Sequence, residues 1–218
     1  MESVNETALQ LSSKLYFERA AEFYSRSINQ IYQKLSSRFL SGDERKRYEK
    51  MLRQNLFLMY LNSYAKACRF ILEEKFNEAL KVLRQNESTW KNIVPEAEKI
   101  GLYLNTITPI FEKIANIIMN SIHARNIGII GELIFEDKYI SFFYKNICRE
   151  ILSIEEKGIL NLNNIIGNYG IDMNGIYNLI KLVKNKYGLD IIIARNDRII
   201  YGEYLDKIIL NRVLKAFQ

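Results

Sequence analysis

Cysteine and histidine are scarce in this 218-residue sequence, and their scarcity argues against several classes of protein. The two cysteines, Cys68 and Cys148, each lie in an apolar helical pattern, so we expect buried free thiols rather than a disulfide. The only histidine, His123, has no second histidine or cysteine at a metal-binding spacing. We therefore expect neither a disulfide-stapled fold nor a bound metal or other cofactor.

Catalytic motifs are also lacking. The sequence has no G-x-S-x-G nucleophile motif, and Gly167-x-x-Gly170 lacks the long strand and the Lys-Ser/Thr pair of a phosphate-binding loop. The acidic pairs at 73–74 and 155–156 are expected to lie on solvated helix faces rather than to act as acid and base. We therefore predict no catalytic residues and a protein that is not an enzyme.

Long apolar runs and a dominant charge are missing as well. No stretch is long enough to cross a bilayer, and the polar start of the sequence does not resemble a signal peptide, so we expect a cytoplasmic protein. The 31 basic and 25 acidic residues give a net charge of +6, but the two signs interleave along the chain. This diffuse excess permits an anionic partner without requiring one.

Residues 158–202 carry the most specific pattern in the chain. The segment 159–162 is a short apolar edge, and 163–170 reads as a brief helix. We expect Gly167 and Gly170 to close that helix at positive φ.

A second helix and a hairpin follow. Asp172 is placed to cap a helix that ends at Tyr187, and four of its apolar residues recur on one face. These residues are Ile176, Leu179, Ile180 and Val183. The β-branched runs 189–194 and 199–201 enclose a polar turn and predict a β-hairpin. A short helix, a turn, a longer helix and a hairpin together predict a winged helix.

The first part of the chain is dominated by helical periodicity. Residues 5–40 predict one long helix, or two that are separated near Tyr16. Ser41 or Asp43 can cap a second long helix that starts at Glu44, and so short a turn implies antiparallel packing.

The middle and the end of the chain also read as helical. We expect a loop at 86–89, and a helix over 96–125 with Pro95 in its first turn and a kink at Pro109. Segment 129–135 is ambiguous between helix and strand. Two further helices are predicted, one from Lys138 to Ile154 capped by Asp137 and a closing amphipathic helix over 204–217.

Two segments resemble tetratricopeptide-type helical hairpins. Phe17-x-x-Ala20-x-x-x-Tyr24 and Phe76-x-x-Ala79-x-x-x-Leu83 both place a small residue between large ones, which allows two helices to approach closely. Ala20 and Ala79 lie 59 residues apart, whereas the tetratricopeptide period is 34. The first unit, together with the helix over 44–72, is also similar to the three-helix MIT domain.

The order of the elements resembles the PCI family, in which helical hairpins pack on a carboxy-terminal winged helix. The expected fold is therefore mainly α, with a helical-hairpin domain over 1–135 and a winged-helix domain over 136–218 that carries a small β-hairpin wing. The resemblance implies a non-catalytic scaffold subunit whose winged-helix edges contact other subunits. One departure is the short segment after the wing, which leaves bundling through a long terminal helix open.

We predict an adaptor that binds protein partners through a groove between helices and a winged-helix surface. Membership of a larger complex and homodimerisation stay open. The candidate anchors in the helical part are aromatic: Tyr16, Tyr24, Tyr48, Tyr60 and Trp90.

The alternative is a winged-helix DNA-binding accessory factor of transcription or replication, with the helical half as dimerisation or effector module. Its candidate DNA contacts are polar residues of the second helix and the wing. They are Asn174, Tyr177, Asn178, Lys181, Lys184, Lys186, Arg195 and Arg198. The nearby aspartates and a net charge of only +2 over 151–218, from nine basic and seven acidic residues, weaken this alternative.

Overall fold

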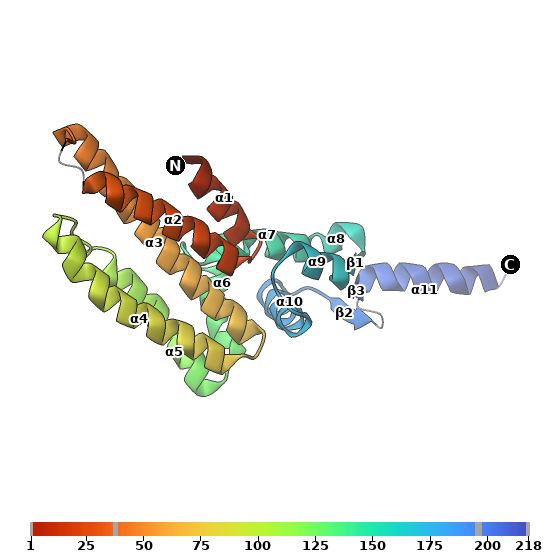
Figure 1. Cartoon of the computed structure of the whole chain (residues 1–218). Helices are drawn as coiled ribbons and strands as arrows, with labels where there is room; N and C mark the ends of the chain where they lie inside the picture. The colour runs from red at the N-terminus through yellow and green to blue at the C-terminus, as the bar shows by residue number, and fades with distance from the viewer. Residues whose placement is uncertain (1, 37–38, 195–197, 217–218) are drawn as a thin grey trace.

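The computed structural model describes residues 2–36, 39–194 and 198–216, and it is mainly helical with a small antiparallel sheet (Figure 1). The first helices are α1 (Glu2–Ser13), α2 (Phe17–Leu35), α3 (Gly42–Leu72), α4 (Phe76–Lys99) and α5 (Thr108–Ala124). The chain continues through η1 (Ile127–Ile130), α6 (Gly131–Phe135), α7 (Ser141–Leu152), α8 (Ile154–Lys157), β1 (Ile159–Asn161) and α9 (Leu162–Asn168). It ends with α10 (Met173–Tyr187), β2 (Ile191–Ala194), β3 (Arg198–Tyr201) and α11 (Gly202–Ala216).

The amino-terminal helical pattern is broken near Tyr16, which was one of the two expected alternatives. Leu15 adopts a left-handed φ of 60° between α1 and α2. The next long helix begins where the sequence predicts it. The Ser41 hydroxyl accepts the backbone N–H of Glu44, while the Glu44 carboxylate accepts the backbone N–H of Ser41. Helices α2 and α3 then run side by side (Figure 1).

The turn between α1 and α2 and the turn between α3 and α4 have the same backbone shape. Leu15 and Glu74 occupy equivalent positions, with φ values of 60° and 61°. Five residues later, Ala20 and Ala79 are fully buried. An alanine at each of these places lets the two helices of a hairpin approach closely.

Two boundaries in the middle of the chain differ from the prediction. Helix α4 runs without a break through 86–89 and through Pro95, whereas we expected a loop and a new helix there. The chain leaves the helix at 100–107, where Gly101 has φ 79°. Pro109 then lies in the first turn of α5 and produces no kink, because an N–H at that place would have no helical partner.

The region before β1 forms short helices. The ambiguous segment 129–135 belongs to η1 and α6, and α7 begins at Ser141, three residues later than expected. Asp137 does not cap α7, whose N-cap is Ile140 without a side-chain hydrogen bond. Its carboxylate instead holds the preceding turn, by accepting the backbone N–H groups of Tyr139 and Ile140 at 2.9 and 2.8 Å.

The elements predicted within 158–202 are present. Strand β3 lies between β1 and β2, so that Ile199 pairs with Leu160 on one side and Ile193 on the other. Asp172 caps α10 by accepting the Gly175 N–H at 2.9 Å. The predicted apolar face of α10 is buried: Ile176, Leu179, Ile180 and Val183.

Both cysteines are buried free thiols, as expected. Burial raises the pKa of the Cys148 thiol to about 12, and it also raises the pKa of Cys68. Neither thiol is therefore reactive in the folded chain at neutral pH.

Helix α11 does not close the fold as we expected. It projects away from the body of the molecule, beyond the sheet (Figure 1). Its first residue is anchored, because the Gly202 N–H donates to the Asp190 carbonyl at 2.8 Å. Further along, Ile209 and Leu210 are 51% and 59% exposed.

The helical half and the carboxy-terminal elements are joined at Arg69, near the end of α3. Its Nη1 donates to the Leu15 carbonyl at 3.0 Å and to the Gly170 carbonyl at 2.8 Å, and its Nη2 donates to Glu18 at 2.8 Å. The guanidinium also stacks over the Phe17 ring. A single buried side chain therefore connects α2, α3 and the turn before α10.

Acidic and basic side chains extend this joint. Glu73 is buried and not on a solvated face as we predicted, because its carboxylate accepts the Asp172 backbone N–H at 3.2 Å. Lys75 bridges Glu73 and Asp172, at 2.8 Å from each carboxylate. The residue that caps α10 is therefore itself held by the turn that ends α3.

Gly170 belongs to the same joint, but not for the reason we expected. Its φ is not left-handed, and neither is that of Gly167. The Gly170 N–H donates to the Lys14 carbonyl at 2.9 Å, and a Cβ at this position would lie 2.7 Å from the Leu15 carbonyl oxygen. Only glycine allows the two backbones to approach so closely.

Replacing Arg69 by methionine is expected to lower the free energy of unfolding by about 3 kcal/mol, because buried carbonyls and Glu73 lose their donor. The matched control is Lys66→Met, which removes the outer ion pair with Glu18 and a cation–π contact with Phe70, and should cost less than about 1 kcal/mol. Urea unfolding monitored by circular dichroism measures both. Equal losses would show that the guanidinium does not hold the joint.

Gly170→Ala is expected to destabilise the protein by about 1–3 kcal/mol, since the new methyl group meets backbone that cannot move freely. Gly167→Ala provides the control, because nothing lies within 4 Å of its Cβ position and alanine favours the helix. The same unfolding measurement applies. A Gly170→Ala variant as stable as Gly167→Ala would contradict the close approach.

Candidate interaction surfaces

The predicted DNA-reading face of α10 is partly occupied by the rest of the chain. Asn178 is only 6% exposed, and the prediction that it is free to contact a partner is wrong. Its amide donates to the Leu72 carbonyl at 2.8 Å and to the Glu74 carboxylate at 3.1 Å. Tyr177 is half-buried, and only Asn174 of the three remains exposed.

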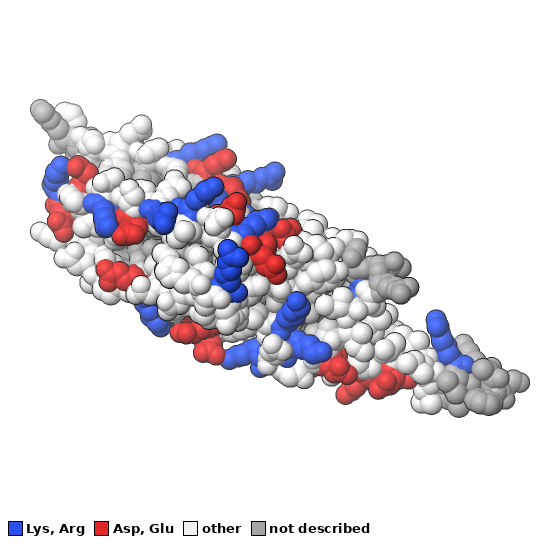
Figure 2. All heavy atoms as spheres, turned by 90° about the horizontal axis from the view of Figure 1, so that it is seen from below, with Lys and Arg blue, Asp and Glu red and all other residues white. Residues whose placement is uncertain are grey.

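The described basic candidates are exposed, but three of them have partners within the chain, and the first, Lys181, donates to the Asn178 side-chain oxygen at 3.5 Å. Lys184 donates to the Ile191 carbonyl at 3.0 Å, and Lys186 pairs with Glu136. Lys181 and Arg198 are exposed, while Arg195 lies outside the described residues. On the face seen in Figure 2, basic and acidic side chains alternate, and no field of one sign covers the surface. Such a surface gives little of the phosphate attraction on which DNA affinity depends.

Some of the aromatic candidates are buried in the core, and others are only half-buried. Tyr24 and Tyr60 are buried, so the prediction that they anchor a partner is wrong, and burial raises the pKa of both phenols. Tyr48 is half-buried. Tyr16 is also half-buried and donates to the Gly167 carbonyl at 3.3 Å, which adds it to the joint.

Trp90 differs from the other aromatics because it forms the floor of a groove between α4 and α5. Its ring is 9% exposed and packs edge-on against Phe111 at 4.9 Å and Tyr60 at 4.7 Å. Its indole N–H donates to the Thr108 hydroxyl at 3.2 Å, which ties α4 to the start of α5. Trp90 is buried like Tyr24 and Tyr60, but among the predicted anchors it is the one that lines this groove.

The groove consists of two adjoining hollows of about 520 and 480 Å³. Both are lined by Trp90, Lys91, Thr108 and Glu112. The hollows extend from Leu83 to Pro95 on α4, a distance of about 18 Å at the helical rise per residue. An apolar floor of this length matches about three turns of a bound helix.

The walls of the groove are polar. Glu87 on α4 forms an ion pair with Lys91 one turn later. Arg84 on α4 and Glu112 on α5 face the groove from opposite walls, and neither forms an ion pair with another described residue. Burial, followed by the carboxylates of Glu87 and Glu112, raises the pKa of Tyr64 beneath them to about 12. The groove therefore combines an apolar floor with one unpaired charge of each sign.

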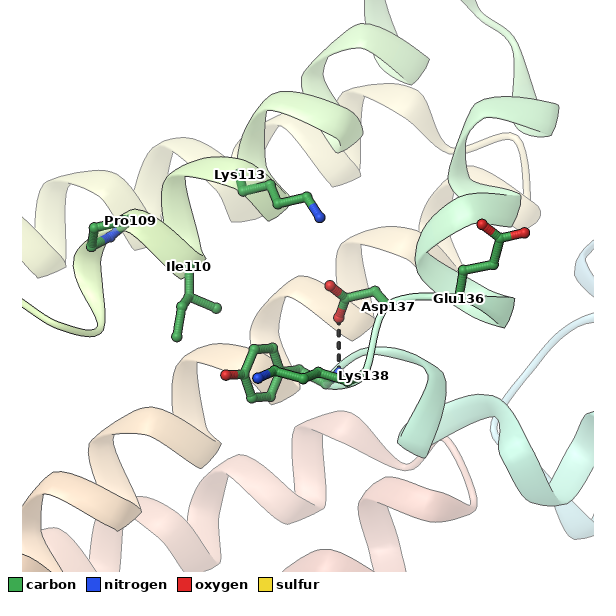
Figure 3. A pocket seen from close by; sticks show the side chains of 7 residues that line it. Pro109, Ile110, Lys113, Glu136, Asp137 and Lys138 are labelled. Carbon is green, nitrogen blue, oxygen red and sulfur yellow. Dashed lines mark hydrogen bonds between the residues drawn. The ribbon is translucent and has the colours of Figure 1, made fainter.

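A second hollow of about 590 Å³ lies between α5 and the loop before α7, where Lys113 extends toward the loop (Figure 3). Its acidic groups already have structural partners. Asp137 accepts backbone N–H groups of the turn before α7, and Glu136 pairs with Lys186. Lys138 lies over the Tyr139 ring at 4.7 Å. This hollow offers few unused polar groups to a ligand.

The end of the molecule that carries the sheet exposes apolar side chains. Ile192 and Ile193 are 40% and 44% exposed on opposite faces of β2, and β2 is an edge strand. Edge strands usually carry charges that prevent pairing with other chains, but β2 reads Ile-Ile-Ile-Ala. On α11, Ile209 and Leu210 continue the apolar exposure.

The sequence analysis missed the α5 wall of the groove and the exposed edge. The wall includes Ala115 and Met119, to which the sequence analysis gave no role. A signal was present in Thr108-Pro109, which is typical of a helix start. At β2, three successive isoleucines without alternation indicated that both strand faces are apolar.

No chemical centre emerges from the described side chains. Within the described ranges, no group of three or more His, Cys, Asp or Glu residues is arranged to hold a metal ion. His123 is exposed on α5. Among the helices of those ranges, none is both long and apolar enough to cross a membrane. Comparisons with protein-family models, curated proteins and solved structures gave no match.

The groove should bind apolar probes next to Trp90, the only tryptophan of the chain. We expect a naphthalene dye to quench Trp90 fluorescence in the native protein by energy transfer. Ala115→Glu should reduce this quenching at least threefold, because a charge then stands on the groove wall. Ala124→Glu, at an exposed position of the same helix, is the control. Equal quenching in both variants would place the dye elsewhere.

Proposed function

We propose that this chain is a non-catalytic adaptor that binds an amphipathic helix in the groove between α4 and α5. The observation that carries the proposal is a groove about three helical turns long, whose lining combines polar walls with the apolar side chains of Leu83, Ala115 and Met119 beside Trp90. Residues on such a floor supply most of the binding energy in helix-in-groove complexes, while the walls fix the register.

The carboxy-terminal elements supply a second interface in this proposal. The order α7, β1, α9, α10, β2, β3 and the sheet order β1-β3-β2 support our interpretation of this part as a winged helix. The two matching helical turns at Leu15 and Glu74 support hairpins of tetratricopeptide type. Together these features favour a PCI-like scaffold, in which the uncharged edge β2 contacts another subunit.

The adaptor is preferred to the DNA-binding alternative because of α10. Asn178, one of the two predicted contacts on α10 that could read adenine, donates its amide to the Leu72 carbonyl and the Glu74 carboxylate within the chain. Lys184 and Lys186 are also engaged. Exposed Asn174, Lys181 and Arg198 leave too few contacts for sequence-specific reading.

The proposed function predicts that partner proteins depend on the groove. The full chain, Ala115→Glu and Ala124→Glu would each be used to capture proteins from cells that naturally produce this chain. We expect partners that bind the wild type and Ala124→Glu to bind Ala115→Glu at least tenfold more weakly, because an unpaired carboxylate would be buried under the partner helix. Partners retained equally by all three proteins would reject the groove as the binding site.

A further inference from the structure

We propose that the groove between α4 and α5 takes helix α11 of a second copy of this chain, so that the protein associates head to tail. The inference rests on the proposed use of the groove and adds the identity of one occupant. Among the described residues, the groove and α11 offer matching features. One is an apolar floor and the other an apolar helix, and each lies between charges of opposite sign.

The size of α11 fits the groove. It has 15 residues, which corresponds to about 22 Å, against the groove length of about 18 Å. Its described apolar stripe consists of Leu205 and Ile209, one turn apart, and Ile209 is more than half exposed. Isolated helices of this length are marginal in water, so α11 gains most from a surface that covers its stripe.

The charges beside the stripe correspond to the charges on the groove walls. Asp206 and Arg212 lie three residues before and after Ile209, which places them about 60° to either side of it. Neither forms an ion pair with another described residue. With Ile209 on the groove floor, Asp206 faces the α4 wall with Arg84, and Arg212 faces the α5 wall with Glu112.

The same chain cannot satisfy both features by itself. Helix α11 begins beyond the sheet and points away from α4 and α5, which lie at the other end of the molecule (Figure 1). A contact between one copy's helix and another copy's groove is heterologous, so its repetition produces a ring or an open chain rather than a closed two-fold dimer. A contact of this small area is expected to be weak and dependent on concentration.

Sedimentation of the purified full chain from about 1 to 200 µM tests the proposal at the weak affinities expected for small interfaces. The mean mass of the wild type should rise above 25.7 kDa with concentration. Two substitutions each place a charge in one of the two features, Ala115→Glu in the groove and Ile209→Glu on α11. Each should abolish the rise in mean mass. An equimolar mixture of these two variants should associate again and stop at two chains, because it contains one intact groove and one intact helix.

Charge reversal provides a second measurement at exposed positions, where folding is not at risk. Glu112→Lys and Arg212→Glu should each weaken association roughly threefold, and a chain that carries both changes should recover the wild-type affinity. Recovery of the affinity in the double variant would support the assigned contact between Arg212 and Glu112. Weakening without recovery in the double variant would overturn the assigned orientation of α11.

The remaining outcomes either contradict self-association through the groove or distinguish it from the adaptor function. Association that survives Ala115→Glu but not Ile209→Glu would indicate pairing between two α11 helices. A wild type that stays monomeric would exclude self-association, and loss of foreign partners by Ala115→Glu would still support the adaptor. Head-to-tail association together with unchanged partner capture by Ala115→Glu would keep this inference and reject the adaptor.

Discussion

The arrangement of this protein depends on one buried guanidinium. Arg69 donates to backbone carbonyls from two turns that lie far apart in the sequence, at Leu15 and Gly170, and it pairs with Glu18. A charge that is removed from water is costly unless it is paired and hydrogen-bonded, and here Nη1 and Nη2 donate hydrogen bonds while Nε lies 3.6 Å from the Glu73 carboxylate. The turn after α1, helix α3 and the turn before α10 must therefore come together as one set, and a partial assembly would leave the cation unpaired.

This joint determines which surfaces remain for other molecules. Glu73 and Lys75 hold the Asp172 cap, and Asn178 closes the contact between α3 and α10. The face of α10 that a DNA-binding winged helix would present is thus partly committed to the fold. Unused apolar surface remains at the two ends of the molecule, in the groove of α4 and α5 and along β2 and α11. The position of the joint therefore favours the proposed interaction through the ends over one through α10.

The sequence predicts well those features of the fold that depend on residues close together in the chain. Ser41 and Asp172 cap helices through their nearest backbone neighbours, so a short segment contains the whole interaction. Pro95 was misread as a helix start. A proline inside a helix removes one backbone hydrogen bond, and packing of the long helix α4 compensates for that loss. Glu73 was misread because its partners lie about a hundred residues away. The groove was missed for the same reason, since it exists only once α4 and α5 are placed side by side.

The groove itself follows from the way its aromatic floor is packed. Phe111 contacts Trp90, Tyr60 and Tyr64 with ring centroids 4.9–5.6 Å apart, and these rings fill the space between α3, α4 and α5 from the inside. Small residues on the outer side, such as Ala115, leave a hollow above these rings, although Trp90 and Phe111 themselves are only 9% and 2% exposed. Adding bulk there would fill the hollow and bury more of its apolar lining, so the open form costs stability in the isolated chain. A second helix that covers the same lining would return that stability through association, and this links the unfilled groove and the exposed stripe of α11 to a single physical cause.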